Sequence, residues 1–302
     1  GTGRLRIRGP LDCAGDLNND GYAEFFDTIR FLELFDAATG CGDGGPSLPG
    51  GVRVNNEAWS DVPGDATWDL AAPGTDGSRV WTFGGPTAPE AISDGPAPLV
   101  NAAYRFPAAA ATSADYEDPS RSSSTVELWF RPTETSTQQL LWEAGGGARG
   151  AALLIENGQV HLDVQNGSPT PARASAPITT DWQQVVGTIN IATGELRLYV
   201  NGQFEASANT GGTERWAGGN PSGLGQVASS VVGNLSPSPF DGHIAIYRFY
   251  QNTLLSDAQV ATAYDAVILA SEPCPDAADL NSDGALDAAD ILVHLQQLAD
   301  CM

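Results

Sequence analysis

Two stretches of the chain alternate apolar and polar residues around an Asn-Gly pair. LLIENGQVHLDV covers residues 153–164, and LRLYVNGQFEAS covers residues 196–207. An alternation of period two places apolar side chains on one face of a strand, and Asn-Gly suits the tight turn between antiparallel strands. Each stretch therefore predicts a β-hairpin.

Between residues 46 and 268 the same pattern of short strands continues, separated by turns rich in Gly, Pro and Asn. Further strands are expected in TVELWFRP at 125–132, WQQVVGTIN at 182–190 and FDGHIAIYRFY at 240–250. Residues 46–124 are expected to supply the earlier strands of the same domain. Together these segments provide enough strands for two packed sheets.

Both ends of the chain show a different pattern, in which apolar residues recur at helical spacing. Near the N-terminus they surround almost the whole of a short helix, at Phe25, Phe26, Ile29, Phe31, Leu32, Leu34 and Phe35. Near the C-terminus they form one stripe, at Ile291, Leu292, Leu295 and Leu298. A helix that is apolar on all sides must be buried, and an apolar stripe needs a partner. The patterns divide the chain into residues 1–45, a β region at 46–268, and residues 269–302.

Each of these helices follows a twelve-residue stretch with oxygen-bearing side chains at alternate positions. The stretches are DLNNDGYAEFFD at 16–27 and DLNSDGALDAAD at 279–290, with Gly21 and Gly284 where the chain must turn sharply. A calcium ion takes about six to eight oxygen ligands, so the spacing predicts one Ca²⁺ ion in each loop. The expected ligands are Asp16, Asn18, Asp20, Tyr22, Glu24 and Asp27 in the first loop, and Asp279, Asn281, Asp283, Ala285, Asp287 and Asp290 in the second.

Tyr22 and Ala285 would coordinate through their backbone carbonyls, and the ninth position, Glu24 or Asp287, often acts through a water. The alternative is that both stretches are solvated acidic turns. In that case the four carboxylates of each loop would repel one another.

The four cysteines bracket the two loops in pairs of similar spacing. Cys13 and Cys41 flank the first loop, and Cys274 and Cys301 flank the second. We interpret them as two local disulfides in a protein that is secreted or displayed at the cell surface, although four cysteines allow three connectivities.

The charge of the chain excludes several kinds of partner. Its formal net charge is −23, and every basic side chain is an arginine. Such a surface repels phosphate backbones and anionic lipids, so neither nucleic acid nor a membrane is an expected partner. No run of about 18 apolar residues is present to span a bilayer. The acidity favours calcium as a ligand; alternatively, it only keeps an extracellular protein soluble in salty surroundings.

In the order of its elements the central region resembles the laminin G-like domain, one of the concanavalin A-like jelly-roll sandwiches. The matching phrases, within about 125–264, are VELWFRP, ENGQVHLDV, WQQVVGTINIATGELRLYVNG and VVGNLSPSPFDGHIAIYRFYQNTLLSDAQVATAY. The resemblance implies a mainly β fold that binds glycans or extracellular proteins through loops at one rim. It also implies that residues near 46 and 268 lie side by side.

The terminal segments, at 13–41 and 274–301, resemble the repeats of dockerins, which attach secreted proteins to cohesin domains in a calcium-dependent way. As in that family, prolines and Gly15 leave no room for an entering helix, and Asp27 and Asp290 close the loops. The sequence departs from the family in two ways: the repeats lie at opposite ends of the chain, and Phe25-Phe26 and Ala288-Ala289 stand where small hydroxyl pairs often contact the cohesin.

We therefore expect the two terminal helices to pack together and form one small α-helical module from both ends of the chain. The alternative is that each unit docks separately on the central domain or pairs with another molecule.

No residue is assigned a catalytic role. Glycosidases on this kind of sandwich place carboxylates two or three residues apart on one strand, whereas Glu127 has no second acid beside it. Asp115 and Glu117 alternate, but within a polar, proline-containing stretch typical of a loop. His161 and Asp163 share a strand face, as a base and its orienting acid would, yet no nucleophile accompanies them.

Binding is the function class that the sequence favours. Trp216, in the glycine-rich GGTERWAGGNPSG, could stack on a sugar ring; alternatively it folds back over the sandwich. The first hypothesis is a non-catalytic glycan- or protein-binding domain with calcium-dependent attachment to a cohesin-type partner. The second is that the calcium units are only an intramolecular clasp on a structural surface protein. The third is a carbohydrate-active enzyme that uses Glu127 or Glu156.

Overall fold

The computed structural model describes residues 54–58, 61, 64–69, 79–84, 88–97, 100–212, 214–269 and 293. Apart from Val293, these belong to one of the two compact units of the chain, Leu48–Leu269. The two calcium loops, the four cysteines and the module expected from the chain ends lie outside the described residues. Their ligands, pairing and packing therefore stay predictions.

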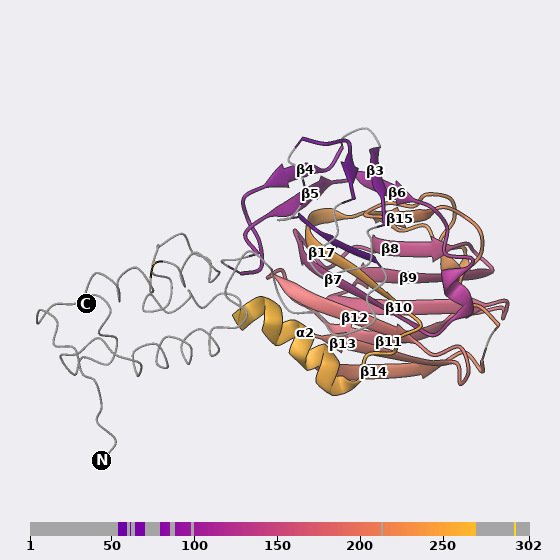
Figure 1. Cartoon of the computed structure of the whole chain (residues 1–302). Coiled ribbons are helices and arrows are strands. Elements are labelled where there is room, and N and C mark those ends of the chain that lie inside the picture. Colours follow the sequence, from indigo (N-terminus) through magenta and orange to yellow (C-terminus); the bar gives the residue numbers. More distant parts are fainter. Residues whose placement is uncertain are drawn as a thin grey trace, which may run out of the picture. The chain divides into compact units, whose positions relative to one another are not determined.

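Two antiparallel sheets make up the described unit, as the alternating patterns predicted (Figure 1). The first sheet has the order β14-β13-β12-β7-β17-β5-β4, and β1 pairs with β17. Its strands are β1 (Val54–Glu57), β4 (Glu90–Ile92), β5 (Ala103–Pro107), β7 (Ser124–Pro132), β12 (Gln183–Ile189), β13 (Glu195–Val200), β14 (Gln203–Asn209) and β17 (Asp241–Gln251).

The second sheet has the order β11-β10-β9-β8-β15-β6-β3-β2. Its strands are β2 (Thr67–Trp68), β3 (Trp81–Gly84), β6 (Ala110–Ser113), β8 (Gln139–Gly145), β9 (Arg149–Glu156), β10 (Gln159–Asn166), β11 (Ala172–Pro177) and β15 (Ser222–Leu224). A short strand, β16 (Ser238–Pro239), pairs in parallel with β8. Strands β1 to β6 confirm that residues before 124 supply the earlier part of the sandwich.

Both predicted hairpins are confirmed. Strands β9 and β10 are joined at Asn157-Gly158, and β13 and β14 at Asn201-Gly202. All four turn residues have positive φ, between 49° and 76°. A turn of this kind matches the right-handed twist of the strands, and Asn and Gly reach positive φ at the lowest cost.

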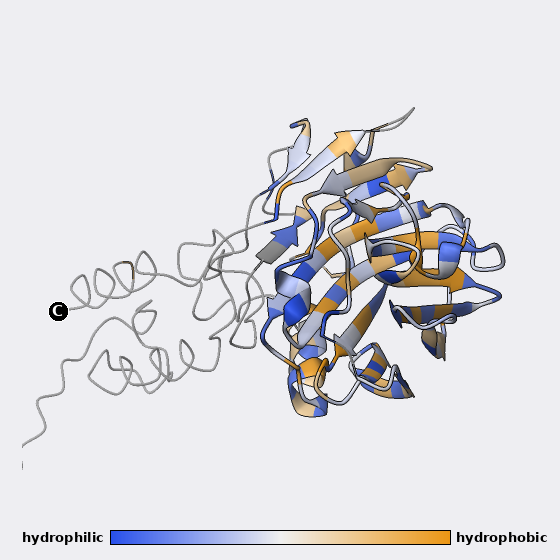
Figure 2. Cartoon of the chain, turned by 90° about the vertical axis from the view of Figure 1, so that its right-hand side faces the viewer, coloured by the Kyte–Doolittle hydropathy of each residue, from blue (hydrophilic) through white to orange (hydrophobic). Residues whose placement is uncertain are grey.

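Between the sheets lies one large apolar core to which both contribute. Fully buried tryptophans from several parts of the chain meet in it, at Trp68, Trp81, Trp142 and Trp216. Figure 2 shows apolar residues distributed along the strands of both sheets. Because side chains alternate across a strand, each strand contributes every second residue to this core.

The helix α2 (Asp257–Leu269) covers the opposite face of the first sheet (Figure 1). Tyr264 of the helix stacks on Trp129 of β7, with ring centroids 5.4 Å apart and an angle of 8° between the planes. Val267 and Val260 add apolar contacts on the same face. This cover explains why strands β7 and β17 are buried on both faces. No described helix is long and apolar enough to cross a membrane.

Candidate functional site

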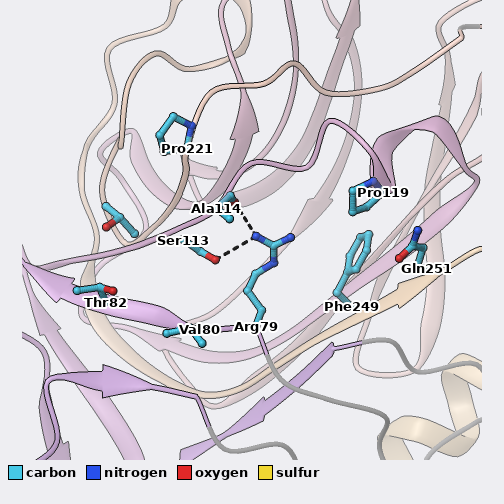
Figure 3. Close-up of a pocket in the computed structure, with 10 residues that line it drawn as sticks. Arg79, Val80, Thr82, Ser113, Ala114, Pro119, Pro221, Phe249 and Gln251 are labelled. Carbon is cyan, nitrogen blue, oxygen red and sulfur yellow. Dashed lines mark hydrogen bonds between the residues drawn. The ribbon is translucent and has the colours of Figure 1, made fainter.

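A cavity of about 580 Å³ opens where the ends of the two sheets meet. Strands β3 and β6 of the second sheet form one side and the end of β17 of the first sheet forms the other. A short 3-10 helix, η2 (Pro119–Arg121), borders it. The lining residues are Arg79, Val80, Thr82, Thr112, Ser113, Ala114, Pro119, Pro221, Phe249 and Gln251 (Figure 3). We call this cavity the Arg79 pocket; its volume is in the range typical of small-molecule sites.

Arg79 is the charged group of the pocket and is held in place from several sides. Its Nη1 donates to Ser113 Oγ at 3.0 Å and to the carbonyl of Ala114 at 2.6 Å (Figure 3). Its Nη2 lies 3.4 Å from the carbonyl of Asp115. The guanidinium carbon also lies 3.7 Å from the ring centre of Tyr116, a cation-π contact. The charge is therefore fixed at one position in the pocket.

Aromatic residues form the floor beneath Arg79. The ring of Phe249, which lines the pocket, packs edge-on against Tyr116 with centroids 4.9 Å apart. The hydroxyl of Tyr116 contacts the hydroxyl of Tyr247 in the core. Burial raises the pKa of Tyr116 to about 12, although the charge of Arg79 acts in the opposite direction. The phenol therefore stays neutral at physiological pH and serves as a fixed platform.

Hydrogen-bonding groups surround this floor. The hydroxyls of Thr82, Thr112 and Ser113 line the β3–β6 side of the pocket. On the other side, the Oε1 atom of Gln251 is buried and has no hydrogen-bond partner among the described residues. The site therefore combines a cation, hydroxyl groups, an amide side chain and apolar surface, the mixture with which proteins bind small polar ligands.

None of these lining residues was a candidate from the sequence. They come from segments as far apart as residues 79 and 251, and each is unremarkable in its own segment. The one local signal is Arg79 itself, a basic residue directly before a strand in a strongly acidic chain. Only the pairing of β3 with β6, and the meeting of both with the end of β17, brings the set together.

Trp216, the residue expected to contact a ligand, has no exposed surface. Its indole Nε1 donates to the carbonyl of Ser122 at 3.1 Å, and its ring packs against Tyr116 and Trp142 in the core. A ring without an exposed face cannot stack on a sugar. The expectation of sugar stacking is therefore corrected: the indole folds back into the sandwich, as the alternative interpretation had it.

Asp115 and Glu117 lie in the polar loop that carries Tyr116. The Oδ1 atom of Asp115 accepts the backbone N–H of Glu117 at 2.9 Å, and Glu117 Oε1 pairs with Arg121 and Arg215. The two carboxylates thus hold the loop in shape. Through the carbonyl of Asp115, this loop also helps to hold Arg79.

His161 and Asp163 share a face of β10, as expected, but they serve separate partners. His161 Nδ1 lies 2.8 Å from Ser175 Oγ on the neighbouring strand β11. Asp163 accepts two hydrogen bonds from Arg173, at 2.7 and 2.6 Å. Burial and the charge of Arg173 lower the pKa of His161, so the imidazole is neutral at pH 7. Asp163 is therefore committed to an ion pair instead of orienting the histidine.

Glu127, the residue that an enzymatic hypothesis would use, is fully buried beneath α2. Its Oε1 accepts from Trp129 at 3.1 Å, from Gln184 at 2.8 Å and from Arg248 at 3.2 Å. Its Oε2 accepts from the hydroxyl of Tyr250 at 2.8 Å. A carboxylate with these partners stabilises the outer face of the first sheet. Glu156, half-buried on β9, lies 3.8 Å from Arg173.

Glu143 of β8 is a titratable group that the sequence did not single out. It is buried on the outer face of the second sheet, where its Oε1 accepts the backbone N–H of Ala228 at 3.2 Å. Its Oε2 has no hydrogen-bond partner among the described residues. Burial raises its pKa to about 8, and the hydrogen bond from Ala228 only partly offsets this rise.

A second cavity, of about 560 Å³, lies beside β4 and is lined by Phe83, Tyr104, Asp65 and Glu90 among others. Within the part of the chain that the structure describes, no group of three or more His, Cys, Asp or Glu side chains is placed to hold a metal ion. The predicted calcium ligands lie outside this part and are not tested by that finding.

Among solved structures, the chain is similar to several proteins at low identity. It matches the binding domain of botulinum neurotoxin DC in complex with rat synaptotagmin II, with 11% identity and a TM-score of 0.42 over 53% of this chain and 40% of that chain. It also matches the CBM40 domain of the Ruminococcus gnavus IT-sialidase bound to α2,6-sialyllactose, with 18% identity and a TM-score of 0.41 over 50% of this chain and 91% of that one. A third match is a leech intramolecular trans-sialidase, with 17% identity and a TM-score of 0.42 over 58% and 27% of the two chains. At these scores we draw no conclusion about the ligand, and the chain spans less than half of the toxin structure.

The comparisons with protein families and curated sequences give one positive result. No curated protein sequence matches the chain significantly. A laminin G family model, described as the concanavalin A-like lectin/glucanases superfamily, matches residues 107–261. This segment covers strands β6 to β17 and the start of α2, and it includes almost all of the sequence phrases that suggested the resemblance. The chain therefore belongs to the concanavalin A-like lectin/glucanases superfamily.

Proposed function

We propose that this protein is a secreted, non-catalytic recognition protein whose lectin-like sandwich binds a glycan in the Arg79 pocket. The observation that carries the proposal is the composition of that pocket. A fixed guanidinium, three hydroxyl side chains and an amide side chain line one open cavity of about 580 Å³. Sugars present many hydroxyl groups that both donate and accept hydrogen bonds. A site that binds them must supply donors and acceptors of this kind.

The position of the pocket supports a binding role over a structural one. It lies at an end of the sandwich, where loops join the strands. Changes in the sequence of such loops do not disturb the core. Val80, one of its lining residues, is 50% exposed, so the cavity is open to solvent. The superfamily to which the chain belongs includes lectins, which agrees with glycan recognition.

The test is a glycan screen with the full-length chain, followed by titration calorimetry of the best ligand with two variants. Thr82→Val removes a pocket hydroxyl at nearly constant volume, and Thr180→Val does the same at an exposed position outside the pocket. Loss of one hydrogen bond to a sugar hydroxyl should weaken binding about 2- to 10-fold. The Thr180 variant should bind as the wild type does. Equal affinities for all three proteins would place the glycan outside the Arg79 pocket. If no glycan in the screen bound, an extracellular protein would become the better candidate ligand.

We further propose that the two terminal calcium loops attach the protein to a cohesin-type partner on a scaffold. The support is the sequence: two loops with the same ligand spacing, each bracketed by cysteines. A panel of cohesin domains, tested in calcium and in chelator, examines this directly. Capture that requires calcium supports attachment. A melting temperature that requires calcium, without capture by any cohesin, would instead support a clasp that only joins the chain ends.

A further inference from the structure

Arg79 carries a positive charge that no carboxylate compensates within the described residues. Most of the other described arginines have a carboxylate oxygen within 4.0 Å, and Arg149 is the only other exception among them. The chain has 37 acidic residues, so carboxylates are abundant. An arginine that is half-buried in a cavity and unpaired in such a protein leaves a local positive potential for a ligand to complement.

The hydrogen bonds of Arg79 leave its Nη2 group largely available. Nη1 is used by Ser113 and Ala114, whereas Nη2 has a single long contact with the carbonyl of Asp115 at 3.4 Å. Nε has no hydrogen-bond partner among the described residues, but it is buried and has no surface that a ligand could reach. An N–H of Nη2 is therefore the group of Arg79 that can donate to a carboxylate oxygen.

Three lining residues lie on the other side of Arg79 from Ser113 and Ala114. Figure 3 shows Pro119, Phe249 and Gln251 there, opposite the two dashed hydrogen bonds. Gln251 lines this side of the pocket, and its Oε1 atom is buried without a hydrogen-bond partner among the described residues. Pro119, which is half-buried, offers apolar surface to the carbon atoms of the same ligand.

We infer that the glycan bound in the Arg79 pocket carries a carboxylate, as in a uronic acid, with the carboxylate against Nη2 of Arg79. This inference rests on the proposed function and specifies its ligand class. The net charge of −23 disfavours anions at the rest of the surface, so the selection depends on this local contact.

Isothermal titration of the full-length chain with D-glucuronate and D-galacturonate, and with glucose and galactose as neutral partners, tests the inference. The acids should bind at least 10-fold more tightly than the neutral sugars. Arg79→Met should remove this preference, and Arg79→Lys should restore it only in part because an ammonium group cannot reproduce the hydrogen bonds that fix the planar guanidinium. Arg105→Met, which removes the same charge from an exposed position outside the pocket, should leave the preference unchanged.

Two results overturn the inference in different ways. If the wild type binds neutral sugars as tightly as the acids, the carboxylate contact is wrong while glycan binding stands. If folded wild-type protein binds none of these sugars or a wider glycan panel, the proposed function fails as well. The comparison of acid with neutral sugar needs only the wild type, so it remains decisive even if an Arg79 variant does not fold.

Discussion

At the scale of single residues, burial decides what each ionisable group does. Glu127 and Glu143 are both buried glutamates on β-strands, yet their surroundings differ. Glu127 accepts hydrogen bonds from four side chains, including the guanidinium of Arg248, whereas Glu143 accepts one from the backbone of Ala228. An ion in an apolar setting is stable only with enough partners. Glu143 therefore favours its neutral, protonated form.

This difference predicts a pH dependence of stability. Because burial raises the pKa of Glu143 from 4.5 to about 8, the folded state holds a proton that the unfolded state releases above pH 4.5. The contribution of this group should therefore fall as pH rises from about 4.5 to about 8, and stay constant above that. Glu143→Gln removes the titration and should raise the free energy of unfolding at pH 8 by on the order of 3 kcal/mol.

Urea unfolding of wild type and variant between pH 4 and 9 measures this effect. Glu195→Gln, at an exposed position on β13, serves as the matched control. The difference between Glu143→Gln and wild type should grow with pH, whereas the control should show no such trend. A difference that is independent of pH would show that the carboxyl of Glu143 is not protonated in the folded state.

At the scale of elements, the two Asn-Gly hairpins are equivalent in sequence and different in surroundings. Gly158 and Gly202 have the same φ, +76°. A Cβ atom added at Gly158 would meet nothing within 4 Å, whereas one added at Gly202 would lie 3.0 Å from the Cβ of Tyr264 on α2. The second hairpin therefore forms part of the contact between the first sheet and its helix.

Replacement of each glycine by alanine separates these contributions. Gly158→Ala should cost about 1 to 2 kcal/mol, since an alanine at positive φ is strained. Gly202→Ala carries the same strain and also pushes against α2, so it should cost at least about 1 kcal/mol more. Chemical unfolding of both variants measures the difference. Equal losses of stability would mean that α2 moves away from the hairpin without cost.

At the scale of the whole molecule, the two chain ends are predicted to act together. Their predicted loops and helices lie outside the described residues. The proposal that they form one module rests on the apolar faces of the helices that follow the loops. Leu295 and Leu298 belong to the apolar stripe of the predicted second helix, whereas Gln296 and Gln297 would lie between them on its other faces. Residues on the stripe should therefore influence calcium binding at a distance, and residues beside it should not.

Leu295→Asp combined with Leu298→Asp leaves all proposed calcium ligands in place. If the two ends pack as one module, this double change should weaken calcium binding at both loops by at least 10-fold, because each loop depends on the packed helices. Gln296→Asp with Gln297→Asp adds the same two charges and should have little effect. Calcium titration of the full-length variants measures both. Unchanged affinity in the leucine variant would indicate two independent units.

The sequence by itself determined the strands, the two hairpins and the family of the sandwich. These follow from local rules, since alternation sets which face of a strand is apolar and Asn-Gly sets the turn. It also determined the charge and the two calcium-loop patterns at the chain ends. The Arg79 pocket, the burial of Trp216 and the partners of Glu127 were decided only by the tertiary structure. Each depends on contacts between residues far apart in the chain, such as Arg79 with Ser113 or Glu127 with Arg248, and no local pattern records which distant strand becomes a neighbour.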